Sequence, residues 1–347
     1  MLWKRSTLHP YKRKGSRVLA ILILVISTSI SVGSTYASTS EFVACKVWNP
    51  ESKDYSLHGN FEIQDNEVIA TSVGTLCKGL IEIPEGVTEI RHSVFAAASE
   101  IKEISLPSTM RTIGNYAFQY STLETVTAKN GIQDIGISAF HGSQLKFFSS
   151  VSTVKNISNS AFYNTNLNSF NFSSSIETIG ESAFQSSQLQ SVRLPSSLSS
   201  IGTYAFADIT SLTNFEFPTG ITEIPEGILA LNSSLGTPVS VELLSTIHIP
   251  DSVVKISDYA FKNRNSITSI DLSFYLKELG TQSLSGTAIT SIYFPQSLET
   301  ISVEALMNTP LTSIKLNEGI KRIESSAFRD TLISKAYIPS SIEYLHR

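Results

Sequence analysis

The sequence has little charge, and little of that charge is positive once its N-terminal segment is set aside. Charged residues make up only 16% of the 347 residues and hydrophobic residues 41%, so the chain has ample apolar surface to bury and is not disordered. Residues 38–347 keep 20 of the 26 basic residues and all 30 acidic ones, a formal net charge of −10. Few groups remain to neutralise phosphates, which argues against nucleic acid and against an anionic membrane surface as the partner.

Catalytic and metal-binding motifs are also missing from the sequence. It contains no H-E-x-x-H, no G-x-S-x-G, no phosphate-binding glycine loop and no EF-hand loop. The histidines that follow the N-terminal segment are scattered, and no repeated position carries histidine or paired carboxylates: His58, His92, His141, His248 and His346. We therefore expect no metal, no cofactor and no enzyme activity, with a carbohydrate-active enzyme as the less favoured alternative.

The first 37 residues have the pattern of a signal peptide. Six basic residues precede an apolar run from Val18 to about Val32, and the small-residue site Thr35-Tyr36-Ala37 follows. The run is shorter than the roughly 20 residues that span a bilayer, so we predict cleavage after Ala37 rather than a permanent anchor. An uncleaved segment would still place residues 38–347 outside the cytoplasm. The expected location is secreted or cell surface, with no membrane insertion after cleavage.

Residues 38–77 are expected to form a small N-terminal cap. Its two cysteines, Cys45 and Cys77, are the only ones in a chain that leaves the reducing cytosol, so we predict that they form a disulfide. A lipoprotein cleavage site at Cys45 is the alternative, but about a dozen residues separate Cys45 from the apolar run. Residues 61–69 are expected to form a hairpin that meets the first repeat.

After residue 78 the sequence repeats itself about every 22 residues. Each unit ends in a small residue followed by a large apolar one, and we number the units by these pairs. Units 1 to 11 end at Phe95, Phe118, Phe140, Phe162, Phe184, Phe206, Leu229, Phe261, Leu284, Leu306 and Phe328. An incomplete twelfth unit occupies residues 333–347. The interval after Leu229 is nine or ten residues longer than the others, which predicts a loop insertion at about residues 230–243.

Each unit has two apolar segments before its closing pair. The first reads L-x-x-I-x-L-P, as in residues 189–195, and its alternation predicts a strand with one buried face. The second is a pair of apolar residues three positions apart, often followed by a glycine for which we expect a positive φ, as at Gly114. The small residue of the closing pair lets each Phe stack on the Phe of the next coil. These apolar columns are buried only if the units stack into a solenoid.

The unit L-x-x-I-x-L-P-x-x-I-x-x-I-G-x-x-A-F-x-x-S resembles the BspA-like leucine-rich repeat family of bacterial surface proteins. The resemblance covers about residues 78–347 and implies a β-rich leucine-rich repeat solenoid, a curved right-handed coil with a concave sheet. It also implies adhesion to extracellular proteins, host matrix or other cells. One departure is the third position after the Phe, where the family often has Cys and this chain has Ser or Thr, as at Ser121 and Thr165.

The outward positions of the first strand form a hydroxyl-rich face with sparse larger side chains. Five of these are candidate contacts for an extracellular protein or glycan, because aromatic residues and arginine are enriched at interfaces. They are Phe147, Arg193, His248, Tyr293 and Tyr337. An ordinary solvated sheet also favours Ser and Thr at such positions. The alternative is therefore that this face is a solvated surface with no binding role. The matching functional alternative is a non-adhesive scaffold associated with the cell envelope.

Overall fold

The computed structural model describes residues 41–49, 54–71, 79–149, 152–232 and 242–346. The chain divides into two units, residues 1–37 and 38–347, and the description below concerns the second. The predicted signal peptide, Cys77 and most of the predicted loop insertion lie outside the described residues, so the cleavage site and the Cys45–Cys77 disulfide stay predictions. Every regular element in the described ranges is a β-strand. These ranges hold no helix that is long and apolar enough to cross a bilayer.

The cap consists of three antiparallel strands that join the first coil. They are β1 (Glu41–Asn49), β2 (Asp54–Gln64) and β3 (Glu67–Thr71). Strands β2 and β3 form the expected hairpin, whose turn residues Asp65 and Asn66 have φ of 51° and 66°. The hairpin then meets the first unit, because β3 pairs in parallel with β5 (Glu89–Ile90) and β1 pairs with β4 (Gly79–Glu82).

The first apolar segment of each unit lies in one column, which we call the first column. Its strands are β4, β6 (Ile101–Leu106), β8 (Thr125–Ala128), β10 (Phe147–Phe148), β13 (Ser191–Arg193), β15 (Asn214–Glu216), β17 (Thr246–His248) and β19 (Ser269–Asp271). Neighbouring strands are parallel and in register at the repeat spacing, as in the pairs Glu103 with Thr125 and Thr125 with Phe147. Central residues are buried and flanking ones exposed in β13, β15, β17 and β19, which confirms the predicted alternation.

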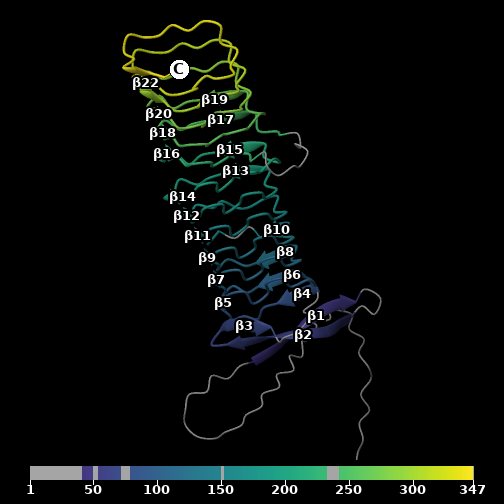
Figure 1. Cartoon of the computed structure of the whole chain (residues 1–347). Helices are drawn as coiled ribbons and strands as arrows, with labels where there is room; N and C mark the ends of the chain where they lie inside the picture. The colour runs from purple at the N-terminus through teal and green to yellow at the C-terminus, as the bar shows by residue number, and fades with distance from the viewer. Residues whose placement is uncertain (1–40, 50–53, 72–78, 150–151, 233–241, 347) are drawn as a thin grey trace, which may run out of the picture. The chain divides into compact units, whose positions relative to one another are not determined.

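The second apolar segment forms another column of parallel two-residue strands, the second column (Figure 1). It contains β5, β7 (Thr112–Ile113), β9 (Asp134–Ile135), β11 (Asn156–Ile157), β12 (Thr178–Ile179), β14 (Ser200–Ile201), β16 (Glu223–Ile224), β18 (Lys255–Ile256), β20 (Glu278–Leu279), β21 (Thr300–Ile301), β22 (Arg322–Ile323) and β23 (Tyr344–Leu345). The incomplete twelfth unit supplies β23, which pairs with β22. The described chain is therefore a β-solenoid of about twelve turns.

The expectation of positive φ for the glycines after this segment is wrong. Gly114 and its equivalents have φ values that other residues also adopt. Glycine stands at these positions for a different reason. A Cβ on Gly114 would lie 2.5 Å from the backbone oxygen of Ile90 in the preceding coil. Close approach of successive backbones therefore selects glycine there.

Positive φ occurs instead on the third side of each coil, around the closing pair. In unit 2, Tyr116 and Tyr120 have φ of 57° and 56°, and equivalent residues repeat this conformation along the array. The arrangement aligns backbone donors with the next coil, so that the Phe118 N–H donates to the Ala139 carbonyl at 2.7 Å. A third column of inter-coil hydrogen bonds results, and it accounts for left-handed backbone at residues other than glycine.

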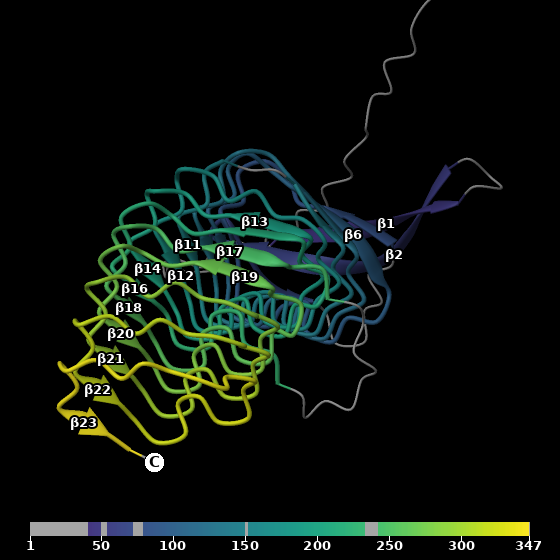
Figure 2. The ribbon, with the colours of Figure 1, turned by 90° about the horizontal axis from the view of Figure 1, so that it is seen from above.

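The core is a row of stacked phenylalanines along the solenoid. Phe95, Phe118, Phe140, Phe162, Phe184 and Phe206 have successive ring centroids 5.1–5.3 Å apart and nearly parallel planes. This confirms the predicted stacking between coils. Figure 2 shows the coils from above, one behind another, with the closing turns in line.

Candidate binding surfaces

All five predicted contact residues lie on the exposed face of the first column. The exposed fractions are 48% for Phe147, 68% for Tyr293 and 72% for Tyr337. They belong to units 4, 10 and 12, so the structure does not gather them into one patch. Tyr293 and Tyr337 are two coils apart, about 10 Å at the usual strand spacing.

Arg193 and His248 on this face are paired within the chain. Arg193 Nε lies 3.1 Å from Glu216 Oε2, and His248 Nδ1 lies 2.8 Å from Asp271 Oδ2, in each case one coil further on. All four side chains are largely exposed, so each pair contributes little to stability. A partner that contacts Arg193 or His248 would have to compete with these carboxylates.

The exposed apolar side chains are concentrated at the C-terminal end of the described array. Phe274 and Tyr275 are 68% and 64% exposed, and with Tyr293 and Tyr337 we call them the C-terminal aromatic group. Sequence reasoning missed Phe274 and Tyr275 because they follow the first-column strand of unit 9 rather than lying in it. The available signal was two aromatic residues where the neighbouring units 8 and 10 have Asp251-Ser252 and Gln296-Ser297.

A second aromatic row follows the closing turns of units 1 to 4. His92 packs edge-on against Tyr116, and Tyr120 edge-on against His141, each with ring centroids 5.2 Å apart. The rings of His141 and Tyr163 are tilted by 35° with centroids 4.7 Å apart. Burial lowers the pKa of His141, so its ring is mainly neutral at pH 7. Tyr120 is 60% exposed. The row was not predicted, because its members occupy different positions within their units.

The coil that carries the insertion contains a fully buried arginine. Arg264 stands three residues after Phe261, where seven other units have Ser or Thr. Its Nε and Nη1 donate to the carbonyls of Leu229 (2.5 Å) and Ile209 (2.7 Å). In regular coils the backbone of the next turn satisfies the second of these carbonyls, as when the Gln144 N–H donates to Ser121. In this coil the Arg264 side chain supplies a donor to each of the two carbonyls.

Glu242, where the described chain resumes after the insertion, balances the charge of Arg264. The carboxyl is 8% exposed and accepts a hydrogen bond from the Ser266 hydroxyl at 3.1 Å. Burial raises the pKa of Glu242, while the nearby Arg264 charge opposes that rise; burial also lowers the pKa of Arg264 to about 10. Each of these two charges therefore opposes the effect of burial on the pKa of the other.

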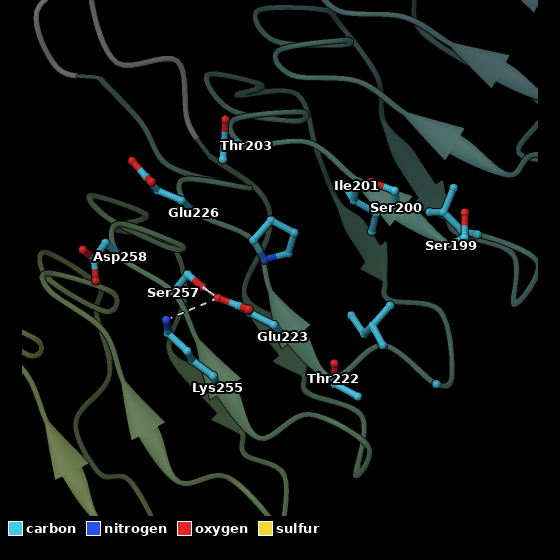
Figure 3. A pocket seen from close by; sticks show the side chains of 14 residues that line it. Ser199, Ser200, Ile201, Thr203, Thr222, Glu223, Glu226, Lys255, Ser257 and Asp258 are labelled. Carbon is cyan, nitrogen blue, oxygen red and sulfur yellow. Dashed lines mark hydrogen bonds and ion pairs between the residues drawn. The ribbon is translucent and has the colours of Figure 1, made fainter.

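A polar cleft opens where the second column is interrupted. No backbone hydrogen bond in the described ranges joins β14 of unit 6 to β16 of unit 7. In the other units the residue after the strand donates its N–H to the preceding coil, as Gly202 does to Ile179 at 2.8 Å, but unit 7 has Pro225, which has no N–H. The cleft has a volume of about 640 Å³ (Figure 3).

Polar side chains line this cleft together with two partly buried core residues, Ile201 and Ile221. Glu223 accepts hydrogen bonds from the Ser257 hydroxyl and lies 3.4 Å from Lys255 Nζ, as the dashed lines in Figure 3 show. Glu226 accepts a 3.0 Å hydrogen bond from the Tyr204 hydroxyl, and burial followed by that carboxylate raises the pKa of Tyr204 to about 12. The described residues contain no group of three His, Cys, Asp or Glu side chains that could hold a metal ion.

Comparison with known proteins places these features in a family. The model of the BspA type leucine rich repeat region matches residues 77–189, 155–238 and 240–347, in six copies. The chain belongs to the BspA-type leucine-rich repeat family. No curated protein sequence matches the chain.

Two solved structures show the same fold as this BspA-type protein. A leucine-rich repeat protein from Bacteroides ovatus is 19% identical, with 87% of this chain and 88% of that chain covered and a TM-score of 0.53. The pneumococcal vaccine antigen PcpA is 20% identical, with 90% and 83% covered and a TM-score of 0.55. At these identities the likeness establishes the solenoid fold and nothing about the ligand. The fold supports protein–protein interaction in general.

The serine and threonine residues that replace the family's cysteine are buried in this BspA-type chain. Thr165, Thr287 and Thr309 donate their hydroxyls to the carbonyl three residues earlier at 2.8–3.0 Å. Ser121 and Ser143 occupy the same position with hydroxyls that have no hydrogen-bond partner. In these units a small side chain fits beside the Phe row, and threonine also satisfies its own hydroxyl.

Proposed function

We propose that this BspA-type protein is exported and acts at the cell surface as an adhesin that binds an extracellular protein or glycan. The observation that carries the proposal is the C-terminal aromatic group, four large aromatic side chains that are each more than 60% exposed on units 9, 10 and 12. Aromatic side chains that lack partners in the free protein are the usual anchors of interfaces. The acidic net charge of residues 38–347 and the repeat architecture support the same proposal.

Export is the first part of the proposal to test. Cells that express the full chain should display or release it with residue 38, Ser38, as the new N-terminus, because cleavage is expected after Ala37. N-terminal sequencing of the protein from the culture medium and from the envelope fraction measures this. Full-length protein that stays in the cytoplasm would contradict export, and cleavage elsewhere would contradict the assigned site only.

Binding separates the adhesin from the alternative, a non-adhesive scaffold of the envelope. The full chain is immobilised and exposed to soluble matrix proteins, to host cell extracts and to cell-wall fractions. An adhesin retains a matrix or cell-surface component, whereas a scaffold retains envelope material alone.

The double substitution Tyr293→Ser and Tyr337→Ser should weaken binding by at least about tenfold, since buried aromatic anchors are worth 2 kcal/mol or more each. Both side chains are exposed in the free protein, so the melting temperature should stay unchanged. The matched control is Tyr120→Ser, an equally exposed tyrosine on the closing turns, which should bind normally. Equal losses from the control and the double variant, measured by surface plasmon resonance, would place the binding face elsewhere.

A further inference from the structure

The facing edges of β14 and β16 form an incomplete part of the second column. In unit 5 the carbonyls of Glu177 and Ile179 accept the N–H groups of Ser199 and Gly202 at 2.9 and 2.8 Å. Within the described part of the chain, the equivalent carbonyls of unit 6, those of Ser199 and Ile201, accept no hydrogen bond, and the Thr222 N–H that would face them donates none. The edge of β14 therefore presents unpaired carbonyls to the cleft, and the edge of β16 presents an unpaired N–H.

Pro225 is the cause of this interruption. It lacks the N–H that would bond to Ile201, and its ring occupies the position where five other coils have a glycine that allows close approach. The closing turns of units 6 and 7 remain bonded, with the Tyr204 N–H donating to the Glu226 carbonyl at 2.9 Å and Phe206 to Ile228 at 3.1 Å. Strands β13 and β15 of the same two units also pair in the first column, so the coils are separated only along the second column.

The cleft also exposes apolar core residues that are covered in the other coils. Ile201 and Ile221 are only partly buried, whereas their equivalents one coil earlier, Ile179 and Leu198, are 1% and 6% exposed. An occupant that covers them must place apolar groups inward. Side chains along an extended peptide alternate between its two faces, so every second residue of such a peptide would cover this floor.

The charged side chains that line the cleft indicate which residues the outward face of a bound peptide should carry. Of the charged groups that line the cleft, Glu223 is paired with Lys255. In the described ranges Glu226 and Asp258 form no ion pair of this kind, although the Asp258 charge also raises the pKa of Lys255. Asp258 accepts the Thr281 N–H and Glu226 the Tyr204 hydroxyl, so both are held in place as carboxylates. A basic side chain would complement them. No aromatic ring lines the cleft on which a sugar could stack.

We propose that the cleft between β14 and β16 binds an extended peptide segment with alternating apolar and basic residues, which completes the second column as an inserted strand. The peptide N–H groups donate to Ser199 and Ile201, and its carbonyls accept from Thr222. This is strand addition of the kind that exposed sheet edges support, here with an edge on each side. The site lies on another side of the coil from the C-terminal aromatic group and does not depend on adhesion through that group.

The test uses the full chain and a synthetic six-residue peptide of alternating valine and lysine, acetylated and amidated. Fluorescence anisotropy should show saturable binding. Two control peptides separate backbone hydrogen bonding from charge complementarity. In the first, methylation of the backbone nitrogens removes the hydrogen-bond donors but keeps every side chain. In the second, glutamate in place of lysine reverses the charge. Each should weaken binding at least tenfold. Equal binding of the methylated peptide would overturn strand addition, as would binding of a soluble oligosaccharide panel in place of the peptide.

The variant Pro225→Gly restores the N–H and the Ile-Gly pair of the regular coils. It should close the second column, slow hydrogen exchange at residues 222–224 and reduce peptide affinity at least tenfold with folding intact. Glu226→Gln tests the charge and should weaken binding several-fold, with Glu318→Gln on exposed unit 11 surface as its control. Unchanged peptide affinity in the Pro225→Gly protein, with slowed exchange at those residues, would overturn the proposal.

Discussion

Replacing Arg264 with alanine should lower the free energy of unfolding by about 3 to 5 kcal/mol, because it leaves a buried charge and two buried carbonyls without partners. The carbonyls are those of Leu229 and Ile209, and the charge is that of Glu242. Urea denaturation followed by circular dichroism measures the change. Arg329→Ala is the control, an exposed arginine in unit 11 whose loss should cost no more than about 0.5 kcal/mol.

The effect of Arg264→Ala should also depend on pH. Burial raises the pKa of Glu242 above its ordinary value, so this carboxyl contributes stability below the unfolded pKa and loses it as the pH rises through the folded pKa. Removing the Arg264 charge raises that pKa further. The destabilisation should therefore be larger at pH 7 than at pH 4, and Glu242→Gln should recover part of it at pH 7. A loss that is equal at both pH values would contradict a role for the charge pair.

Replacing Phe140 with alanine should cost about 3 to 5 kcal/mol, since the ring is fully buried in the middle of the stacked row. It stacks on Phe118 and Phe162 at 5.2 and 5.3 Å and meets the edge of Phe148 at 5.9 Å. The same urea titration measures the loss.

The matched control is Phe140→Leu, which should cost less than about 1.5 kcal/mol. Units 9 and 10 already have the fully buried Leu284 and Leu306 at this position, so the coil accepts leucine. If leucine and alanine were equally destabilising, the stacking geometry rather than burial would set the stability of the row.

The repeat could be predicted from the sequence because the same types of side chain recur at a fixed spacing. The closing Phe, the first-column Leu and the outward positions follow from spacing alone, and the structure confirms the stacked row and the alternation at residues such as Arg193 and Val192. The prediction of positive φ at glycines such as Gly114 was wrong, since positive φ occurs at residues such as Tyr116 instead. A sequence pattern shows that a position is small but does not say whether conformation or close approach requires it.

The two interruptions of the array were harder to predict. Pro225 and Arg264 each replace a regular residue of the unit, glycine in one case and serine or threonine in the other, so both carried a signal. Interpreting it requires knowing which neighbouring backbone groups each residue faces: Pro225 removes a donor to Ile201, whereas Arg264 supplies donors to Leu229 and Ile209. The C-terminal aromatic group was predicted only in part, because Phe274 and Tyr275 lie in a turn whose exposure depends on the path of the chain.

The most direct test of the proposed binding face is amide hydrogen exchange of the full chain, alone and with the protein that it retains from matrix or cell extracts. We expect slowed exchange in the first column and following turns of units 9 to 12, which include Phe274, Tyr293 and Tyr337. Slowed exchange confined to the closing turns of units 1 to 4, around Tyr120 and His141, would contradict the proposal that the C-terminal aromatic group is the binding surface.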